Sequence, residues 1–194
     1  MSSTSPSLLK IYDGWAGYQA ALVNAVAPLT VEQLAWRGAP QLRSVGNLIV
    51  HIVLGRVHWI HNTLGIESAT VDEWLAESTT GPDSHGQYGV NRGIRRSSTA
   101  LVAGLEATWS MIEGALSRWT VDDLERSFQE TYQGKTYVVP YRWVLWRIMS
   151  HDIHHGGELA QALGIQGISI PDLGDQGGHL TEVSEVSEIE GHAE

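Results

Sequence analysis

The sequence predicts an all-α protein folded as a four-helix bundle. Four segments of about 20 residues repeat apolar side chains at intervals of three and four, which is the period of an amphipathic helix. A short Thr-Val-acid-x-Leu motif follows both the first and the third segment and indicates a weak internal duplication. Bundles build metal and ligand sites between facing helices, so we expect the functional residues on inner helix faces.

The first helix is expected over residues 7–26. Its apolar face consists of Leu8, Ile11, Tyr12, Trp15, Tyr18, Leu22 and Val26. Pro28 ends it, because the residue before a proline avoids the helical region. Thr30 and Gln33 then match a capping box at the start of a short helical turn.

The second helix is expected to begin after Ser44 as N-cap and to continue to Leu64, with Gly65 closing it. A polar, glycine-rich stretch follows over residues 67–91. Because ordinary connections are much shorter, this stretch is predicted to be a functional loop or lid with a turn of helix over residues 71–76.

The third helix is expected over residues 91–118, and Thr120 begins a second short turn. The following residues, 128–139, are β-branched and aromatic around Gln133 and Gly134. Such a segment is typical of a small hairpin or of an extended loop, and the sequence leaves both open.

The fourth helix is expected after Pro140, over residues 141–163, with Gly164 closing it. Residues 1–173 are therefore predicted to form one helical domain. The remaining residues, 174–194, are acidic and lack an apolar face, so we expect a disordered tail.

Composition excludes several kinds of protein. The chain has 194 residues and is 42% hydrophobic, which is sufficient for the core of one domain. It has no cysteine, so disulfides, iron–sulfur clusters, thiolate metal sites and a cysteine nucleophile are excluded. Neither a membrane-length apolar segment nor a secretory leader is recognisable, and we expect a cytoplasmic protein without a membrane partner.

The net charge of −10 is concentrated at the C-terminal end. Residues 1–147 contain all 12 Lys and Arg together with 13 Asp and Glu, whereas residues 148–194 contain nine Asp and Glu and no Lys or Arg. The one basic cluster, Arg92, Arg95 and Arg96, is interpreted as solvated surface. No helix presents a basic stripe, so we do not expect nucleic acid as a partner.

The run MSHDIHHGGELAQALG, over residues 149–164, is the most informative motif. It places His151 and His155 four positions apart on a predicted helix, so both imidazoles point to the same side and can reach one metal ion. A third ligand is needed from elsewhere. His51 is the one distant histidine inside an apolar helical run, SVGNLIVHIVLG, and completes the predicted metal site.

Other histidines and acids near this motif stay open as alternatives. His154 could replace either neighbour, although its direction differs by about 100° from that of His155. His58 lies two turns beyond His51 and could shape a pocket. Glu158 could face the site as the catalytic acid or base, or accept a hydrogen bond from a ligand. Asp152 is expected to interact with the N-terminal half of the helix or to contact a ligand imidazole.

These motifs together resemble the DinB-like family, the DinB/YfiT group of metalloenzymes. The resemblance is carried by LTVEQLAWR at residues 29–37, SVGNLIVHI at residues 44–52 and the His-x3-His-x-Gly run that begins at His151. It implies an up-and-down four-helix bundle with a long crossover between helices 2 and 3, a divalent metal on three histidines, and a homodimer. Relatives in this family act on low-molecular-weight thiols, as bacillithiol or mycothiol S-transferases and as a mycothiol-dependent maleylpyruvate isomerase.

Two classes of function follow. Three neutral histidines leave coordination positions open on a zinc, nickel, iron or manganese ion, as in a catalytic site. The first class is therefore a metal-dependent enzyme that acts on a small molecule, either a thiol S-transferase or isomerase, with a low-molecular-weight thiol as cofactor, or a hydrolase. The second is a non-catalytic protein that binds a metal or small ligand, or a stress-related protein.

Overall fold

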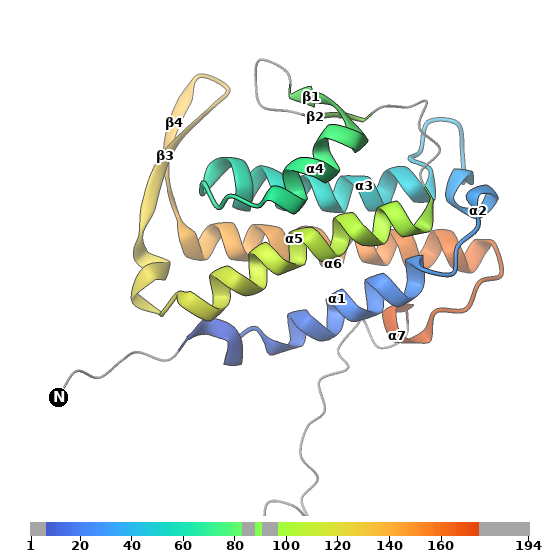
Figure 1. Cartoon of the computed structure of the whole chain (residues 1–194), viewed down its shortest axis with the longest axis horizontal. Helices are drawn as coiled ribbons and strands as arrows, with labels where there is room; N and C mark the ends of the chain where they lie inside the picture. Colours follow the sequence, from blue (N-terminus) through green and yellow to red (C-terminus); the bar gives the residue numbers. More distant parts are fainter. Residues whose placement is uncertain (1–6, 83–87, 91–96, 175–194) are drawn as a thin grey trace, which may run out of the picture.

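The computed structural model describes residues 7–82, 88–90 and 97–174 (Figure 1). Within them the protein is mostly helical, as the sequence predicts, but it also contains two antiparallel pairs of short strands, which the all-α class does not include. No helix in the described part of the chain combines the length and the apolar content that a bilayer crossing requires. The predicted tail lies outside the described residues apart from Gly174, which ends α7.

The first predicted helix is divided in two. A short 3-10 helix, η1 (Leu8–Lys10), precedes α1 (Asp13–Val26). The following turn forms α2 (Val31–Ala35) and begins with the predicted capping box. Thr30 Oγ1 accepts a hydrogen bond from the backbone N–H of Gln33 at 3.3 Å, and Gln33 Oε1 accepts one from the N–H of Thr30 at 2.8 Å.

The second predicted helix changes its winding partway. It begins as α3 (Val45–Arg56), whose N-cap Ser44 accepts a hydrogen bond from the N–H of Asn47 at 3.3 Å. It continues as a π-helix, η2 (Val57–Thr63), and ends before Gly65 with a φ of 66°. π-Helical turns are rare and occur frequently at functional sites.

The stretch predicted as a loop or lid contains regular structure. Residues 69–78 form the helix α4 (Ala69–Ser78), longer than the single turn expected, and it packs against α5. Two strands follow, β1 (Thr79–Pro82) and β2 (Tyr88–Val90), which pair antiparallel.

The third long helix, α5 (Ser98–Arg118), begins later than predicted. Ser97 has an extended backbone and accepts a hydrogen bond from the N–H of Ala100 at 3.2 Å, so it caps the helix. The prediction that Ser97 lies inside this helix is therefore wrong, and the predicted residues 91–96 lie outside the described residues. The second short turn is confirmed as a 3-10 helix, η3 (Asp122–Glu125).

Residues 128–139, for which the sequence allowed either a hairpin or an extended loop, belong to a hairpin. Strands β3 (Ser127–Tyr132) and β4 (Lys135–Pro140) pair antiparallel along their whole length. Gln133 and Gly134 form the turn with φ values of 49° and 75°, and Gly134 adopts its value without strain because it has no Cβ.

The fourth long helix, α6 (Tyr141–Ile165), follows Pro140 directly, as predicted. Gly164 lies inside this helix, so the predicted closure is wrong. Gly167, with a φ of 75°, stands just after the helix end. The short helix α7 (Pro171–Gly174) then packs against α6 and α1.

Contacts between the long helices place the candidate site between α3 and α6. Helix α3 contacts both α5 and α6, and α1 contacts α5 (Figure 1). Their inner faces form one apolar core that includes Trp15, Leu22, Ile49, Ile52, Val53, Leu101, Leu105, Ile112, Leu145, Ile148 and Leu159. The β3–β4 hairpin stands beside the end of η2 and the start of α6 (Figure 1).

Candidate metal centre

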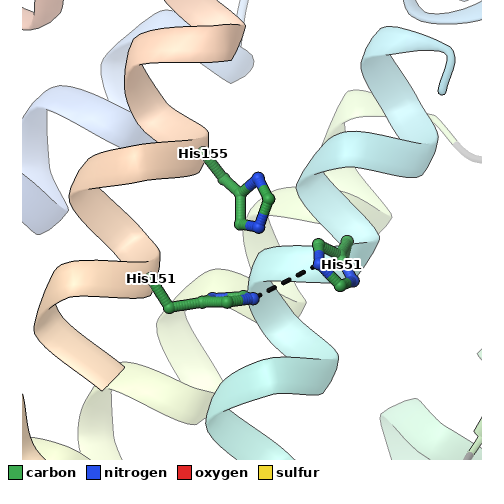
Figure 2. A group of neighbouring side chains, drawn as sticks. All are labelled: His51, His151 and His155. Atoms are coloured by element: carbon green, nitrogen blue, oxygen red, sulfur yellow. Dashed lines mark hydrogen bonds between the residues drawn. The ribbon is translucent and has the colours of Figure 1, made fainter. Parts of the chain in front are cut away.

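The three histidines singled out in the sequence lie together between two helices. His51 comes from α3, and His151 and His155 come from successive turns of α6 (Figure 2). Each offers a ring nitrogen, and the three nitrogens lie within 4.8 Å of one another. The ring centroids are 4.4 to 4.9 Å apart. This group could hold one metal ion.

The spacing of the ring nitrogens suits such an ion. Nε2 of His51 lies 3.3 Å from Nε2 of His151. Two imidazole nitrogens bound about 2.0–2.1 Å from a tetrahedral zinc ion are separated by roughly 3.3 Å. The two nitrogens are within hydrogen-bond distance, and the donor is whichever imidazole carries its proton on Nε2. A cation bound between them would take the place of this hydrogen bond.

Gly55 allows His151 to approach α3 closely. A Cβ atom on Gly55 would lie 2.5 Å from Cε1 and 2.9 Å from Nδ1 of His151. Real Cβ atoms do not come so near to a ring, so no other residue leaves this space. The His151 Nδ1 atom is buried and has no hydrogen-bond partner in the described residues.

Glu158 holds the ring of His155. Its Oε2 lies 2.8 Å from His155 Nδ1, which donates the hydrogen bond when that nitrogen is protonated. His155 Nε2 is then the nitrogen with a free lone pair. The sequence left several roles open for Glu158. This geometry directly supports one of them, the acceptor of a hydrogen bond from a ligand imidazole.

The surroundings keep two of the imidazoles neutral. Burial, together with the positive charge of Arg43, lowers the pKa of His51 to about 4. Burial, together with the neighbouring His155, lowers the pKa of His151 to about 3. Burial would raise the pKa of Glu158, but its hydrogen bond with His155 holds that pKa below the usual value. Neutral imidazole is the form that binds a metal.

Asp152 makes a buried ion pair instead of contacting a ligand imidazole. Its Oδ2 accepts hydrogen bonds from Arg56 Nε at 3.0 Å and Trp15 Nε1 at 3.1 Å, and Arg56 Nη2 lies 2.8 Å away. Both charged side chains are fully buried. Arg56 Nη1 also donates to Gln19 Oε1 at 2.8 Å. This partner was not predicted from the sequence, although Arg56 is the single arginine inside the apolar run of α3 and was the signal for it.

A second close approach joins α1 to α6. The hydroxyl of Tyr18 donates to the backbone oxygen of Asp152 at 3.1 Å. A Cβ atom on Gly156 would lie 1.7 Å from that hydroxyl oxygen. Glycine at this position therefore lets α1 pack directly against the turn of α6 that carries the two histidines.

The alternative histidines take other places. His154 is exposed, and its Nε2 lies 3.5 Å from Glu158 Oε1. With His155 and Glu158 it forms a second group whose ligand atoms could meet, at the surface. His58 lies on η2, with its ring centroid 4.8 Å from that of Trp59, and lines a cavity beside the hairpin.

Comparison with known proteins identifies the family. The model of the DinB superfamily matches residues 16–159, so the chain belongs to that superfamily. A search of curated proteins finds no match.

Solved structures share the fold at low sequence identity. A DinB-like protein from Bacillus cereus is 20% identical, with a TM-score of 0.60, over 87% of this chain and 98% of its own. A conserved protein from Enterococcus faecalis is 14% identical, with a TM-score of 0.62, over 80% of this chain and 95% of its own. A DinB-like protein from Bacillus subtilis is 17% identical, with a TM-score of 0.53, over 82% of this chain and 94% of its own.

Proposed function

We propose that this protein is a metal-dependent enzyme of the thiol S-transferase or isomerase type, in which His51, His151 and His155 hold one divalent ion. The observation that carries the proposal is the convergence of three imidazole nitrogens within 4.8 Å, with one pair separated by 3.3 Å. An all-imidazole set suits zinc, nickel, iron or manganese. Because three ligands leave coordination positions open, the site is of the catalytic kind.

The chain lacks two common sources of a protein nucleophile. It has no cysteine, and no serine stands in a Gly-x-Ser-x-Gly context. A divalent ion in this site would lower the pKa of a thiol or of water and so supply a nucleophile. The low-molecular-weight thiol expected from the family resemblance is the proposed co-substrate.

Glu158 is proposed to orient His155 and to move a proton. Its Oε2 accepts from His155, while its side chain is 46% exposed and Oε1 faces His154 rather than the three histidines. A carboxylate with one oxygen in a fixed hydrogen bond and the other near solvent can take up a proton and release it to water.

Hydrolysis is the alternative chemistry for the same residues, because water can occupy the position that a thiol would take. A non-catalytic role in binding a metal or small ligand would leave the three histidines unchanged and show no turnover.

Metal analysis combined with an activity screen tests the proposal. The purified protein is stripped with a chelator, reloaded separately with zinc, nickel, iron or manganese, and assayed with low-molecular-weight thiols and electrophilic substrates. We expect close to one ion per chain and thiol conjugation only in a reloaded sample. His51→Ala, His151→Ala and His155→Ala should each lose most of the metal, whereas the control His154→Ala should keep it. Full occupancy in His51→Ala would contradict the assignment.

Three further expectations are part of this proposal: the up-and-down topology of the bundle, a homodimer and a cytoplasmic location. Sedimentation analysis of the purified protein measures the second directly, and a monomer at micromolar concentration would contradict it.

A further inference from the structure

A cavity of about 1250 Å³ lies between η2, the β3–β4 hairpin and the first turns of α6. Its walls include His58, Trp59, Glu130, Tyr137, Trp143 and Arg147. Sites for small molecules are typically concave and mostly apolar, with a few polar groups that fix orientation. This cavity has that composition.

The cavity adjoins the three histidines along one seam between two helices. His51 of α3 meets His151 of α6, and further along the same helices Trp59 meets Trp143 at a centroid distance of 5.2 Å. Positions increase on one helix as they decrease on the other, so α3 with η2 runs antiparallel to α6. The cavity therefore begins where the histidine site ends, on the side of the β3–β4 hairpin.

Arg147 stands between the two. It precedes His151 by four residues, so both side chains lie on the same face of α6. In the described part of the chain Arg147 forms no ion pair, in contrast to Arg56, Arg126 and Arg142, each of which has a carboxylate partner. It is also the one Lys or Arg in the cavity wall.

Aromatic side chains form the wall beyond Arg147. Trp59 and Trp143 pack edge to face at 70°, and Trp143 stays 42% exposed. Tyr137 on β4 is 47% exposed and also lines the cavity. The indole rings of Trp59 and Trp143 can stack against a flat ligand. The guanidinium of Arg147 beside them can donate two hydrogen bonds to a carboxylate.

Glu130 limits which anions the cavity accepts. It is the one acidic residue of the wall and lies on β3, where its charge acts on His58. Negative charge at the hairpin side opposes a ligand that is anionic at both ends. The charges thus favour a ligand with its anionic group near Arg147 and an uncharged body toward the hairpin.

From this arrangement we infer that the cavity binds the organic substrate as a monoanionic carboxylate with a flat, apolar body. Arg147 binds the carboxylate, and the Trp59–Trp143 wall packs against the body. The inference rests on the proposed function in one respect: the bound molecule lies beside the site where the ion would activate a thiol or water.

Isothermal titration with naphthoate and with its neutral analogue naphthamide tests the inference. Wild-type protein is measured both zinc-loaded and chelator-treated. A charge-assisted hydrogen bond gives about a tenfold preference for the carboxylate, and we expect it in both samples. Arg147→Met, which keeps an apolar stem, should abolish the preference, and Arg142→Met on the same helix should retain it. Trp143→Leu should weaken both compounds, and circular dichroism verifies that each variant is folded.

The outcomes separate this inference from the proposed function. Equal binding of the two compounds by the wild type, no binding of either, or an unchanged preference in Arg147→Met would overturn it. A preference that vanishes on chelation would also overturn it, because the metal and not Arg147 would then hold the carboxylate. Metal content of the same samples is measured independently. A retained preference in a protein that binds no metal would support the cavity and contradict the metal centre.

Discussion

The imidazole of His151 lies directly against the backbone of Gly55, on the opposite helix. Its Cε1 stands 2.5 Å from the point that a Cβ of residue 55 would occupy. The position of one candidate ligand is therefore determined by the absence of a side chain at a residue with no chemistry of its own.

Gly55→Ala should lower metal affinity by tenfold or more without unfolding α3. The added methyl group forces the His151 ring away from His51, and outer contacts that orient a ligand are typically worth about 10–100-fold in affinity. Alanine is also the better helix former, by about 1 kcal/mol. Competition with a fluorescent zinc chelator measures the affinity.

The matched control is Gly157→Ala, at a position on α6 where a Cβ meets nothing within 4 Å. This variant should bind metal as the wild type does. Equal affinities for all three proteins would show that the close packing of Gly55 and His151 has no role in the site.

Replacement of Glu158 should separate its two proposed roles. Glu158→Gln keeps an oxygen that can accept from His155 Nδ1, so metal affinity should change little, whereas Glu158→Ala removes the acceptor and should weaken binding about tenfold or more. Turnover by metal-saturated Glu158→Gln should fall if the carboxylate carries a proton. Full activity of the glutamine variant would exclude that role.

The metal-free protein should lose stability as the pH falls from about 6.5 toward 4. Unfolded histidine takes up a proton near pH 6.5, but folded His51 does so only near pH 4 and folded His151 near pH 3. Between these values the unfolded chain binds more protons, so the free energy of unfolding decreases with decreasing pH. Urea denaturation of chelator-treated protein at several pH values measures the effect.

The double variant His51→Gln/His151→Gln lacks both of these groups. Its free energy of unfolding should fall less than that of the wild type over the same pH range. A parallel fall in the two proteins would mean that other residues cause the pH dependence.

Arg56→Met should destabilise the protein by about 3–5 kcal/mol, because it leaves the carboxylate of Asp152 buried without its partner. Asp152→Asn should also be destabilising, because it leaves the guanidinium of Arg56 buried without its carboxylate partner. The double variant Arg56→Met/Asp152→Asn leaves no buried charge and should recover part of the loss. Chemical denaturation of the four proteins gives the coupling energy, and strict additivity of the two single losses would contradict a direct interaction.

Much of the candidate site followed from local sequence patterns. His151 and His155 are four residues apart on one helix, and His51 stands in an apolar helical run, so periodicity alone places each on an inner face. Capping by Ser44 and by Thr30 with Gln33 is likewise local and was predicted.

The features that the sequence did not predict depend on distant partners or on competing local signals. Arg56 and Asp152 are 96 residues apart, and the clearance at Gly55 exists only once α3 and α6 have packed. Ser97 was expected inside the third helix, but its backbone is extended and its side chain caps the helix that begins at Ser98. Gly164 was read as a stop, but α6 continues through it to Ile165.

Tyr18 and Gly156 carry a consequence for the evolution of this chain. Residue 156 can gain a side chain only if residue 18 loses its phenol, because both the hydroxyl oxygen and the Cζ atom of Tyr18 lie within 3 Å of the space that a Cβ would fill. Neither substitution is neutral alone: the first forces α1 off α6, and the second leaves a cavity beside His155. Among homologous sequences the two positions should therefore covary, with a bulky aromatic at one restricted to lineages that keep glycine at the other.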